Sequence, residues 1–495
     1  MALEYAHGAV QWLSTDGAST TYTISGLAFQ PKAIKFFWNG LQSSVDATST
    51  TLSQHRGIGF AVSTSSRCCI ASYSEDASTD GAHCVSLASD DCVVGSISSS
   101  GSPRTASRDG ELDLNSIETD GFVLIVDDPT PVSLTVFWEA WGGTDITVAV
   151  IGQASEPAAT GTVDYTVTGF DNNALGDQVV MVIGSTSSAA VNTASITDSG
   201  IEHGFATSTD LSQNVNFTVA SDEASVTTDT NRWAGDKHFF AQMSRGGGSI
   251  NGVAVMSAFA TDKFTLNWTS VGTANRRNFW LAIKGGRWRA GSIVHNARIA
   301  SATSTVAGLP FTPVGVDLFG VGYWNLNGYG ELAPDVYTIG CASSTSSRRS
   351  LAGYDQSAVT TSNTALALNY SSCACIINAS GTVTVAIDIN QMTNDGFELI
   401  TDTATSTEHW NMWFGYLSFG SVPPSAEQEG YRWRNDDGNE TAATWVAAQD
   451  TNISRNTNVN TRIRVLLDTT LNTNSGTLKL QYKRADEPDS EWRDV

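Results

Sequence analysis

The chain has 495 residues, of which 41% are hydrophobic and 16% are charged, and its formal net charge is −23. A single hydrophobic core rarely serves more than about 300 residues, so several domains are expected. The strong negative charge argues against a nucleic-acid partner, because a polyanion would be repelled over most of the surface. No apolar run approaches the roughly 20 residues that a membrane-spanning helix requires.

Short apolar runs bounded by Gly, Asn, Asp and Ser recur along the whole chain. Such runs predict β-strands, and no stretch of ten or more residues carries the apolar stripe of an amphipathic helix. We therefore expect an all-β fold of antiparallel sheets. Representative runs are VQWL (10–13), AIKFFW (33–38), FVLIV (122–126), LTVFW (134–138), VVMVI (179–183) and LKLQY (478–482).

Four sequence landmarks recur three times in the same order, at steps of roughly 140 residues. They are a glycine in a polar turn (Gly26, Gly169, Gly308), a run that resembles GFAVSTSSR (from Gly59, Gly204, Gly340), a TDGF-like motif (119–122, 261–264, 394–397) and an aromatic-rich strand that ends in glycine (Gly143, Gly286, Gly420). This period is far longer than that of solenoid repeats, so each copy is predicted to fold around its own core as an antiparallel β-sandwich.

The landmarks divide most of the chain into segment 1 (1–143), segment 2 (144–286) and segment 3 (287–421). The junctions between segments are short, which predicts a rigid array, either closed around a pseudo-threefold axis or extended as a string. The Pro-containing stretch 422–429 is predicted to be a linker. After it, 430–495 alternates apolar and polar residues and is predicted to form a small Ig-like β-domain with Trp433, Trp445 or Trp492 in its core.

The cysteines are not arranged as a metal site. Cys68 and Cys69 correspond to Arg349 and Ser350 in segment 3, so the fold does not require thiols there. Cys373-Ala-Cys375 places two thiols on one face of a strand, without the further His or Cys ligands of a zinc site. We expect buried free thiols, and disulfides formed after release from a reducing cytosol are the alternative. The remaining cysteines are Cys84, Cys92 and Cys341.

No motif in the chain predicts catalysis. There is no GxSxG nucleophile elbow, Walker A loop, HExxH motif or EF-hand loop. The acidic turn at 436–440 has the Asp-Gly chemistry of a hairpin, which is favoured over a calcium site. A glycosidase carboxylate pair is not excluded by composition, but no pair recurs at matched positions. We therefore predict no catalytic residue, no cofactor and no metal site, and expect that the protein is not an enzyme.

A basic island stands out in this acidic chain at the junction of segments 2 and 3. It is expected to form an inter-domain seam in which Arg stems pack and the guanidinium groups pair with carboxylates, rather than a nucleic-acid site. Its members are Arg276, Arg277, Lys284, Arg287, Arg289 and Arg298.

Three aromatic residues in a Gly-rich stretch are candidates for glycan contact. Tyr323, Trp324 and Tyr329 lie among Asn and Gly residues, and exposed rings beside polar groups can stack on the apolar face of a sugar. The alternative is structural: Trp324 would end a core strand, and the tyrosines would cover the edge of that strand.

Several motifs resemble the β-rich repeat units of bacteriophage virion proteins that are often grouped with tail fibres. The similar stretches are SGLAFQPKAIKFFWNG (25–40), GIGFAVSTSSRCCIASYSEDA (57–77) and TDGFVLIVDD (119–128). The C-terminal YRWRNDDGNETAATWVAAQDTNI (431–453) is similar to a small β-domain at the ends of phage structural proteins. Segment 2 departs most from the pattern, with TDKF in place of TDGF. The resemblance supplies no catalytic residue.

The resemblance implies a non-enzymatic structural component of a phage virion, exposed as a tail appendage, spike or tail-fibre-type protein in contact with the host surface. A capsid- or tail-decorating accessory protein is the first alternative, and a secreted carbohydrate-binding or carbohydrate-active protein is the second. The N-terminus lacks a secretory signal pattern, so synthesis in the host cytoplasm and assembly into the virion are expected. Expected partners are other virion proteins, further copies of the chain and a host surface glycan, without nucleic acid or a membrane span.

Overall fold

The computed structural model describes residues 3–79, 83–101, 104–173, 176–220, 228–243, 250–272, 276–322, 329–330, 334–405, 412–421, 426–439, 442–454, 456, 459–469, 481–482 and 493–494. It divides the chain into two compact units: a body, Ala2–Val422, and a C-terminal unit, Pro423–Val495. Every element assigned in the described residues is a strand, and all paired strands run antiparallel. The all-β prediction is confirmed. The described part of the chain holds no helix with the length and apolarity to cross a bilayer.

Segment 1 contributes eleven strands to the body. Six of them belong to a seven-stranded sheet of order β1-β11-β3-β5-β6-β7-β15, and four make a second sheet of order β2-β10-β9-β8. The strands are β1 (Glu4–Trp12), β2 (Thr21–Ile24), β3 (Pro31–Trp38), β4 (Ala47–Ser49), β5 (Gln54–Ser63), β6 (Ser66–Ser74), β7 (Cys84–Ser89), β8 (Val94–Ser100), β9 (Thr105–Glu118), β10 (Gly121–Asp128) and β11 (Leu134–Gly142).

Segment 2 has the same pattern of sheets. Its seven-stranded sheet has the order β12-β22-β14-β16-β17-β18-β26, and its four-stranded sheet the order β13-β21-β20-β19. The strands are β12 (Val148–Ser155), β13 (Gly161–Thr166), β14 (Gln178–Ser185), β15 (Ser195–Ile196), β16 (Ser199–Thr207), β17 (Gln213–Ala220), β18 (Thr230–Gly235), β19 (Phe240–Met243), β20 (Ile250–Ala260), β21 (Lys263–Ser270) and β22 (Arg277–Lys284).

Segment 3 repeats this strand order again. Its sheets have the orders β23-β33-β25-β27-β28-β29-β4 and β24-β32-β31-β30. The strands are β23 (Arg287–His295), β24 (Thr303–Val306), β25 (Thr312–Val321), β26 (Tyr329–Gly330), β27 (Asp335–Ala342), β28 (Arg348–Asp355), β29 (Thr364–Asn369), β30 (Ala374–Ile377), β31 (Val383–Thr393), β32 (Gly396–Ala404) and β33 (Met412–Ser421).

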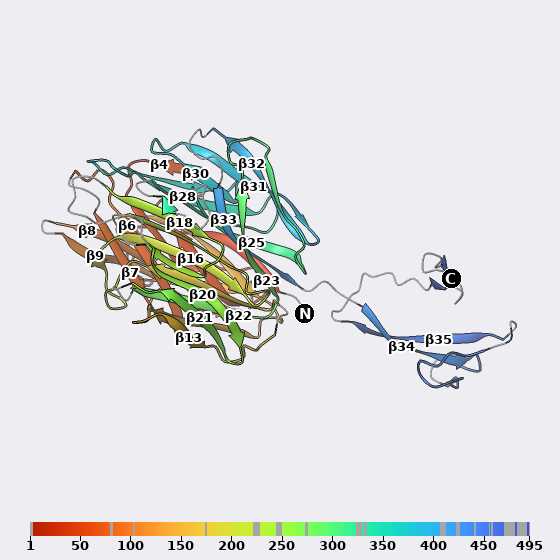
Figure 1. The fold of residues 1–495 in the computed structure, drawn as a ribbon. Coiled ribbons are helices and arrows are strands. Elements are labelled where there is room, and N and C mark those ends of the chain that lie inside the picture. Colours follow the sequence, from red (N-terminus) through yellow and green to blue (C-terminus); the bar gives the residue numbers. More distant parts are fainter. Residues whose placement is uncertain are drawn as a thin grey trace. The chain divides into compact units, whose positions relative to one another are not determined.

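The three segments exchange short edge strands in a closed cycle. β15 of segment 2 pairs with β7 of segment 1, β26 of segment 3 pairs with β18 of segment 2, and β4 of segment 1 pairs with β29 of segment 3. Figure 1 shows this last exchange, with the red strand β4 lying among the blue-green strands of segment 3. Each seven-stranded sheet is therefore completed by another segment, which covers an edge that would otherwise be open to pairing. The three segments form one body.

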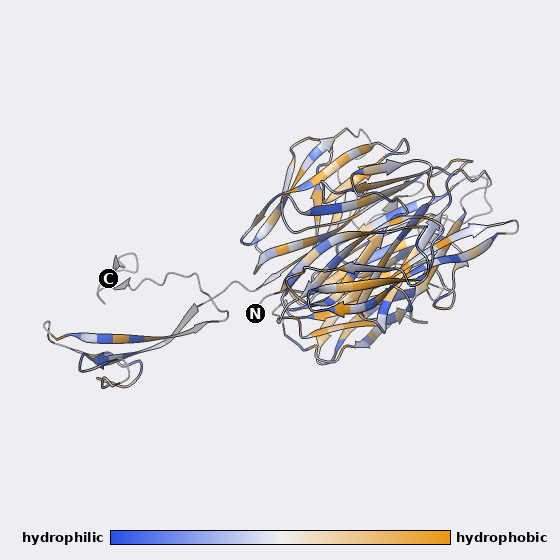
Figure 2. Cartoon of the chain, turned by 180° about the vertical axis from the view of Figure 1, so that it is seen from behind, coloured by the Kyte–Doolittle hydropathy of each residue, from blue (hydrophilic) through white to orange (hydrophobic). Residues whose placement is uncertain are grey.

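Four hydrophobic clusters account for most of the body's core. Three of them fill the space between the two sheets of each segment, and the fourth joins residues from the seven-stranded sheets of all three segments. The run VVMVI shows how one strand serves two cores. Val179, Met181 and Ile183 belong to the shared central cluster, whereas Val180 and Val182 belong to the core of segment 2. A strand buried on both faces has a continuous apolar sequence, and Figure 2 shows such apolar strands inside the body.

The repeated landmarks lie at equivalent places in the three strand orders. Gly26, Gly169 and Gly308 each follow the first strand of a four-stranded sheet and have φ of +81°, +96° and +76°, a region that glycine adopts at little cost. In each case the glycine N–H donates to the aspartate of the TDGF-like motif, at 3.3, 2.7 and 3.2 Å from the carboxylates of Asp120, Asp262 and Asp395. The turn glycine and the TDGF-like motif therefore make the same contact in each of the three segments.

The arginine that ends the TSSR motif makes equivalent contacts in segments 1 and 3. The guanidinium of Arg67 pairs with Asp113 at 2.5 Å, and that of Arg348 pairs with Asp388 at 2.8 Å. Both pairs join the seven-stranded sheet of a segment to its four-stranded sheet. Tyr73 and Tyr354, which follow in the same two strands, are 6% and 7% exposed. These residues serve packing in both segments.

Gly59, Gly204 and Gly340 hold the two sheets of each segment close together. A Cβ built on them would lie 2.0, 2.3 and 2.1 Å from the carbonyl oxygens of Val93, Phe239 and Cys373. These separations are too short for any side chain. The glycine that opens each GFAVSTSSR-like run is thus required by the approach of backbone from the opposite sheet.

Gly59→Ala is expected to lower the free energy of unfolding by about 1–3 kcal/mol, because the added methyl group must displace backbone. Urea denaturation followed by tryptophan fluorescence measures the effect. Gly17→Ala is the matched control, since nothing lies within 4 Å of its Cβ position, and its change should stay within about 0.5 kcal/mol. Equal stability of the two variants would contradict the packing explanation.

The C-terminal unit contains two small sheets in its described residues. β34 (Ala426–Asn435) pairs with β35 (Thr461–Thr469), and β36 (Gln481–Tyr482) pairs with β37 (Arg493–Asp494). β34 begins inside the predicted linker 422–429. The prediction that Trp445 could be a core residue is wrong, because its side chain is 38% exposed beside two arginines. Trp433 is half-buried, Trp492 lies outside the described residues, and the Ig-like sandwich stays a prediction.

Candidate functional site

A charged cluster lies at the centre of the body, where the three segments meet. Lys35 Nζ of segment 1 is 2.5 Å from Asp317 Oδ2 of segment 3 and 3.2 Å from Glu139 Oε1, and all three side chains are fully buried. The hydroxyl of Tyr5 donates to Glu139 Oε2 at 2.8 Å. From segment 2, His203 Nε2 lies 3.7 Å from Asp317 Oδ2. One ammonium group thus faces two carboxyl groups.

The surroundings of this cluster separate the protonation states of its two carboxyls. Burial raises the pKa of Asp317, but Lys35 and His203 more than offset this, so its pKa lies below the usual value. Burial and the neighbouring charge of Asp317 raise the pKa of Glu139 to about 8, against the opposing effect of Lys35. At neutral pH Asp317 is therefore ionised and paired with Lys35, whereas Glu139 is mostly protonated. Burial lowers the pKa of His203, which keeps its imidazole neutral.

A second buried pair joins the same three segments. Arg56 of segment 1 is 2.6 Å from Asp335 of segment 3, and its other terminal nitrogen donates to the Ser199 carbonyl of segment 2 at 3.1 Å. The guanidinium also lies 4.8 Å from the ring centroid of Tyr337. Burial raises the pKa of nearby Asp355 to about 7. Because Arg56, Asp335, Tyr337 and Asp355 are all buried, these charges hold segments together and are out of reach of a substrate.

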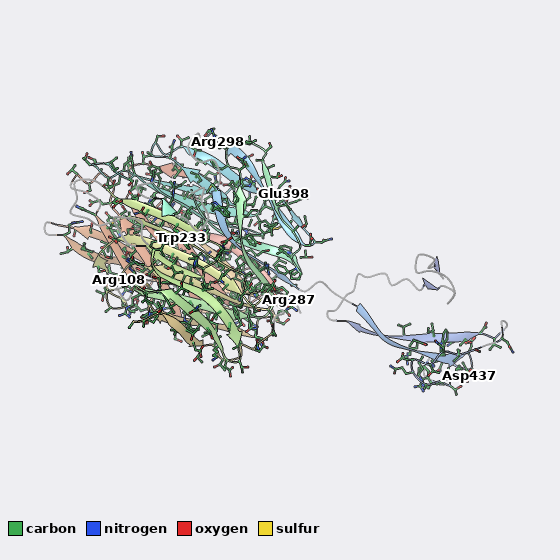
Figure 3. The ribbon with its side chains drawn as sticks, in the orientation of Figure 1. Arg108, Trp233, Arg287, Arg298, Glu398 and Asp437 are labelled. Atoms are coloured by element: carbon green, nitrogen blue, oxygen red, sulfur yellow. The ribbon has the colours of Figure 1, made fainter. Side chains whose placement is uncertain are left out.

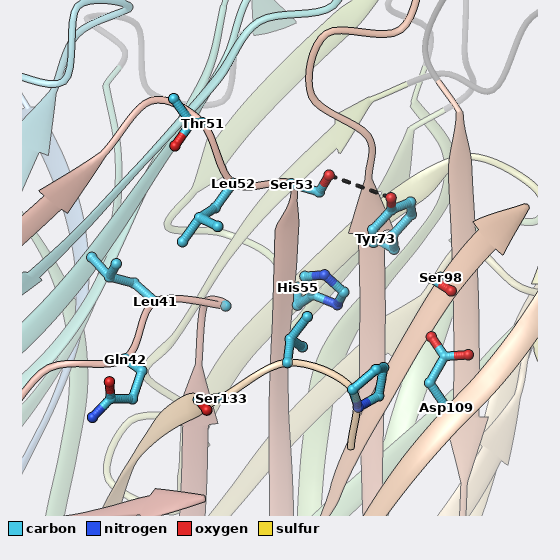
Figure 4. Close-up of a pocket in the computed structure, with 13 residues that line it drawn as sticks. Leu41, Gln42, Thr51, Leu52, Ser53, His55, Tyr73, Ser98, Asp109 and Ser133 are labelled. Carbon is cyan, nitrogen blue, oxygen red and sulfur yellow. Dashed lines mark hydrogen bonds between the residues drawn. The ribbon is translucent and has the colours of Figure 1, made fainter. Parts of the chain in front are cut away.

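An open pocket of about 620 Å³ lies in segment 1, at one end of its sandwich (Figure 4). Strands of both sheets and the loops that follow β3, β4 and β10 form its walls. The lining residues are Gly40, Leu41, Gln42, Thr51, Leu52, Ser53, His55, Tyr73, Ser98, Asp109, Pro131, Val132 and Ser133. Its size is within the range of small-molecule sites in proteins, about 300–1,000 Å³.

Three polar side chains of this pocket come from three different strands. His55 on β5 is 8% exposed and packs edge-on against Tyr73 of β6, with ring centroids 4.9 Å apart. The hydroxyl of Tyr73 donates to Ser53 Oγ at 3.3 Å, the contact drawn in Figure 4. His55 Nδ1 and Oδ2 of Asp109, on β9, are buried and have no hydrogen-bond partner among the described residues. Burial lowers the pKa of His55 to about 4, partly opposed by the charge of Asp109 and by a hydrogen bond to the Ile97 backbone, so the imidazole is neutral at neutral pH.

These polar groups are particular to segment 1. His55 pairs with Tyr73 across the sheet, and the equivalent register pairs are Gly200 with Val219 and Val336 with Tyr354. Asp109 occupies a β-bulge whose counterparts in segments 2 and 3 hold Asn251 and Thr384. The shared fold therefore requires neither the imidazole nor the carboxylate at these positions.

A third feature lies on the ribbon of the C-terminal unit, where arginines share one face. Arg432 is paired opposite Arg464, and Arg434 opposite Arg462. The guanidinium groups of Arg432 and Arg434 lie 4.3 and 4.9 Å from the indole centroid of Trp445. Figure 2 shows the polar and apolar residues alternating along this ribbon. Like charges placed opposite each other disfavour pairing, so this face is chemically suited to an anionic group.

The acidic turn next to that face is held by its own contacts. Asp437, labelled in Figure 3, accepts a hydrogen bond at 3.0 Å from the backbone N–H of Thr444, and Asp436 pairs with Arg462 at 2.6 Å. These contacts use both carboxylates within the hairpin. Among the described residues of the whole chain, no group of three or more His, Cys, Asp or Glu side chains is placed to hold a metal ion.

The residues predicted for glycan contact fall mostly outside the described part of the chain. Tyr323 and Trp324 are not described, and Tyr329 is described only through its backbone, which pairs in β26 with Trp233, a fully buried residue labelled in Figure 3. The hypothesis for these three residues stays untested. The His55–Asp109 pocket was not predicted. Alignment of the three segments could have indicated it, because His55 stands where the other segments have Gly200 and Val336.

The basic island contributes to contacts within and between segments. Arg289 of segment 3 pairs with Asp210 of segment 2 at 3.1 Å. This is an arginine–carboxylate pair between segments, as predicted for the island. Lys284 pairs with Asp171 inside segment 2 at 2.6 Å. Arg277 donates to the carbonyl of Ala189 at 3.2 Å.

All seven cysteines are buried, and the structure places none of them in a disulfide. Cys68 belongs to the central cluster and Cys69 to the core of segment 1, so the adjacent side chains point to opposite faces of β6, as their positions predict. Cys69 Sγ lies 3.6 Å from Cys92 Sγ. Burial raises the pKa of Cys68 well above its usual value, which keeps that thiol protonated and unreactive.

Comparisons with protein-family models, with curated proteins and with solved structures found no match.

Proposed function

We propose that this protein is a non-enzymatic structural component of a bacteriophage virion, displayed on the particle as a tail appendage, spike or tail-fibre-type protein. The observation that carries the proposal is the closed cycle of three like sandwiches within one chain. Such a body has the features of a trimer without depending on protomer concentration, because its subunits are covalently joined. A rigid, concentration-independent body suits a protein that works outside the cell. The phage assignment rests on the sequence resemblance.

The chemistry of the body favours a structural role over a catalytic one. The ionisable groups Lys35, Glu139 and Asp317 are fully buried between segments, out of reach of a substrate. The segment 1 pocket is lined by the His55 imidazole and the Asp109 side chain but lacks a placed nucleophile such as a serine bonded to that imidazole among its described contacts. Binding is the simpler use of such a pocket.

The state of the cysteines favours cytoplasmic assembly over secretion. Seven buried cysteines outside disulfides are typical of a chain that folds in a reducing compartment. This observation supports the virion proposal against the alternative of a secreted carbohydrate-active protein. A capsid- or tail-decorating accessory protein is the second candidate, since the same rigid body would also suit attachment to a particle lattice. Other virion proteins and further copies of this chain are the proposed partners.

Immunogold electron microscopy of purified virions tests the proposal. An antibody against the body should label each particle, and label at the tail would support the appendage role over capsid decoration. Absence of the chain from gradient-purified virions, measured by mass spectrometry, would contradict the proposal. Release of reducing sugar ends from host polysaccharide by the purified chain would contradict the non-enzymatic role.

A further inference from the structure

We propose that the segment 1 pocket binds a neutral polyhydroxylated ligand of the size of one sugar residue, held by His55 and Asp109. This inference goes beyond the virion role and does not depend on it, because it concerns a binding site within the isolated chain. It also concerns residues distinct from Tyr323, Trp324 and Tyr329.

The first argument is the unsatisfied hydrogen-bonding capacity of the pocket. His55 is more than nine-tenths buried, and its Nδ1 has no partner in the described residues. Asp109 is half-buried, but its Oδ2 atom is buried and also has no partner there. A buried polar atom without a partner destabilises a protein measurably, so such atoms usually bond to a ligand or to ordered water. Figure 4 shows both side chains grouped with Tyr73 around the same space.

The second argument is that the fold retains this arrangement without needing it. The same scaffold accepts Gly200 or Val336 in place of His55, and Asn251 or Thr384 in place of Asp109. Only segment 1 combines the imidazole and the carboxylate. A destabilising pair that two sister segments do without is best explained by binding.

The third argument is the chemistry of the lining, which selects the class of ligand. Hydroxyl and amide groups from Ser, Thr, Tyr and Gln can donate or accept hydrogen bonds, as alternating sugar hydroxyls require. Leu41, Leu52 and Val132 provide apolar surface for the C–H face of a sugar ring. The 13 lining residues include no Lys or Arg, and Asp109 is a carboxylate. A phosphate or a carboxylated sugar would lack a counter-charge, so a neutral ligand is favoured.

The proposal can be tested by saturation-transfer NMR on the full chain. The probes are D-glucose, D-galactose, D-mannose and N-acetylglucosamine, with D-glucuronic acid as the charged comparison. At least one neutral sugar should show saturation transfer with a dissociation constant in the millimolar range, as expected for a ligand of about a dozen non-hydrogen atoms. Glucuronic acid should bind more weakly than glucose.

The sister segments supply variants that the scaffold is expected to tolerate. His55→Val and Asp109→Asn introduce residues found at equivalent positions of this chain, and each should weaken sugar binding roughly tenfold or more through loss of a hydrogen-bonding partner. Thr384→Val, at the segment 3 position that matches Asp109, is the control and should leave binding unchanged. Thermal unfolding verifies that each variant is folded. If one of the two variants does not fold, the other still tests the proposal.

Two results would overturn the proposal. One is the absence of saturation transfer from the wild-type chain to every neutral sugar at concentrations of about 10 mM, which would leave ordered water as the partner of these atoms. The other is binding that survives unchanged in both folded variants, which would place the ligand elsewhere. Neither result would affect the proposed virion role, because immunogold labelling tests that role separately.

Discussion

Arg56→Ala is expected to lower the free energy of unfolding of the body by about 3–5 kcal/mol, the range for breaking a fully buried ion pair from one side. Arg56 joins all three segments through Asp335, the Ser199 carbonyl and the ring of Tyr337. Its loss leaves the Asp335 carboxyl buried without the cation that it contacts directly, and the remaining partners cannot move away because they lie in packed strands. The cost therefore exceeds that of a lost surface contact.

Urea denaturation followed by tryptophan fluorescence measures this change. Lys263→Ala is the control, because the Lys263–Asp164 pair is exposed at 41% and 53% and should contribute little to stability. The double variant Arg56→Met/Asp335→Leu should recover most of the lost stability, since it removes both charges together. A loss below about 1 kcal/mol in Arg56→Ala would show that this pair does not hold the segments together.

Glu139→Gln is expected to flatten the dependence of stability on pH between pH 5 and 8.5. The pKa of Glu139 is raised by burial from 4.5 to about 8 in the folded protein. Between these values the folded chain keeps a proton that the unfolded chain releases, so stability is greatest on the acid side and is lost as pH rises through about 8. Each unit of pKa difference is equivalent to about 1.4 kcal/mol, which makes this a loss of a few kcal/mol.

The variant should therefore match the wild type near pH 5, where glutamine imitates the protonated acid, and exceed it in stability at pH 8.5. Asp355, with a pKa raised by burial to about 7, contributes a loss of the same sign that remains in the variant. Histidines act in the opposite direction: burial lowers the pKa of His295 to about 4, so its contribution is lost as pH falls from 6.5 to 4. Denaturation midpoints measured across this range provide the test.

Glu118→Gln is the control for a general effect of removing one carboxylate, because Glu118 is exposed at the end of β9. It should leave the pH profile parallel to that of the wild type. If Glu139→Gln were instead less stable than the wild type at every pH, Glu139 would act as an ionised partner of Lys35 and the protonation argued above would be wrong.

Local chemistry was sufficient to predict the fold class and the alternation of side chains. Runs such as VVMVI and LTVFW lack the helical period, and their β-branched and aromatic residues pack well on a pleated surface, so strands were predictable wherever they occur. The opposite burial of Cys68 and Cys69 follows from the two-residue period alone. The recurrence of Gly59, Gly204 and Gly340 could be read from the sequence, although its cause, the approach of a carbonyl from the opposite sheet, could not.

The tertiary structure alone decided how the segments combine and where charges and cavities lie. Nothing local to Ala47–Ser49 marks it as an edge strand for β29, more than 300 residues away, because pairing between distant strands depends on global packing. Lys35 looks like a solvent-facing residue in an apolar strand, and only the meeting of three segments buries it against Asp317 and Glu139. The pocket of His55 and Asp109 likewise exists only where both sheets and three loops converge. The two-residue period of a strand determines on which face a residue lies, whereas contacts between distant parts of the chain determine what that face packs against.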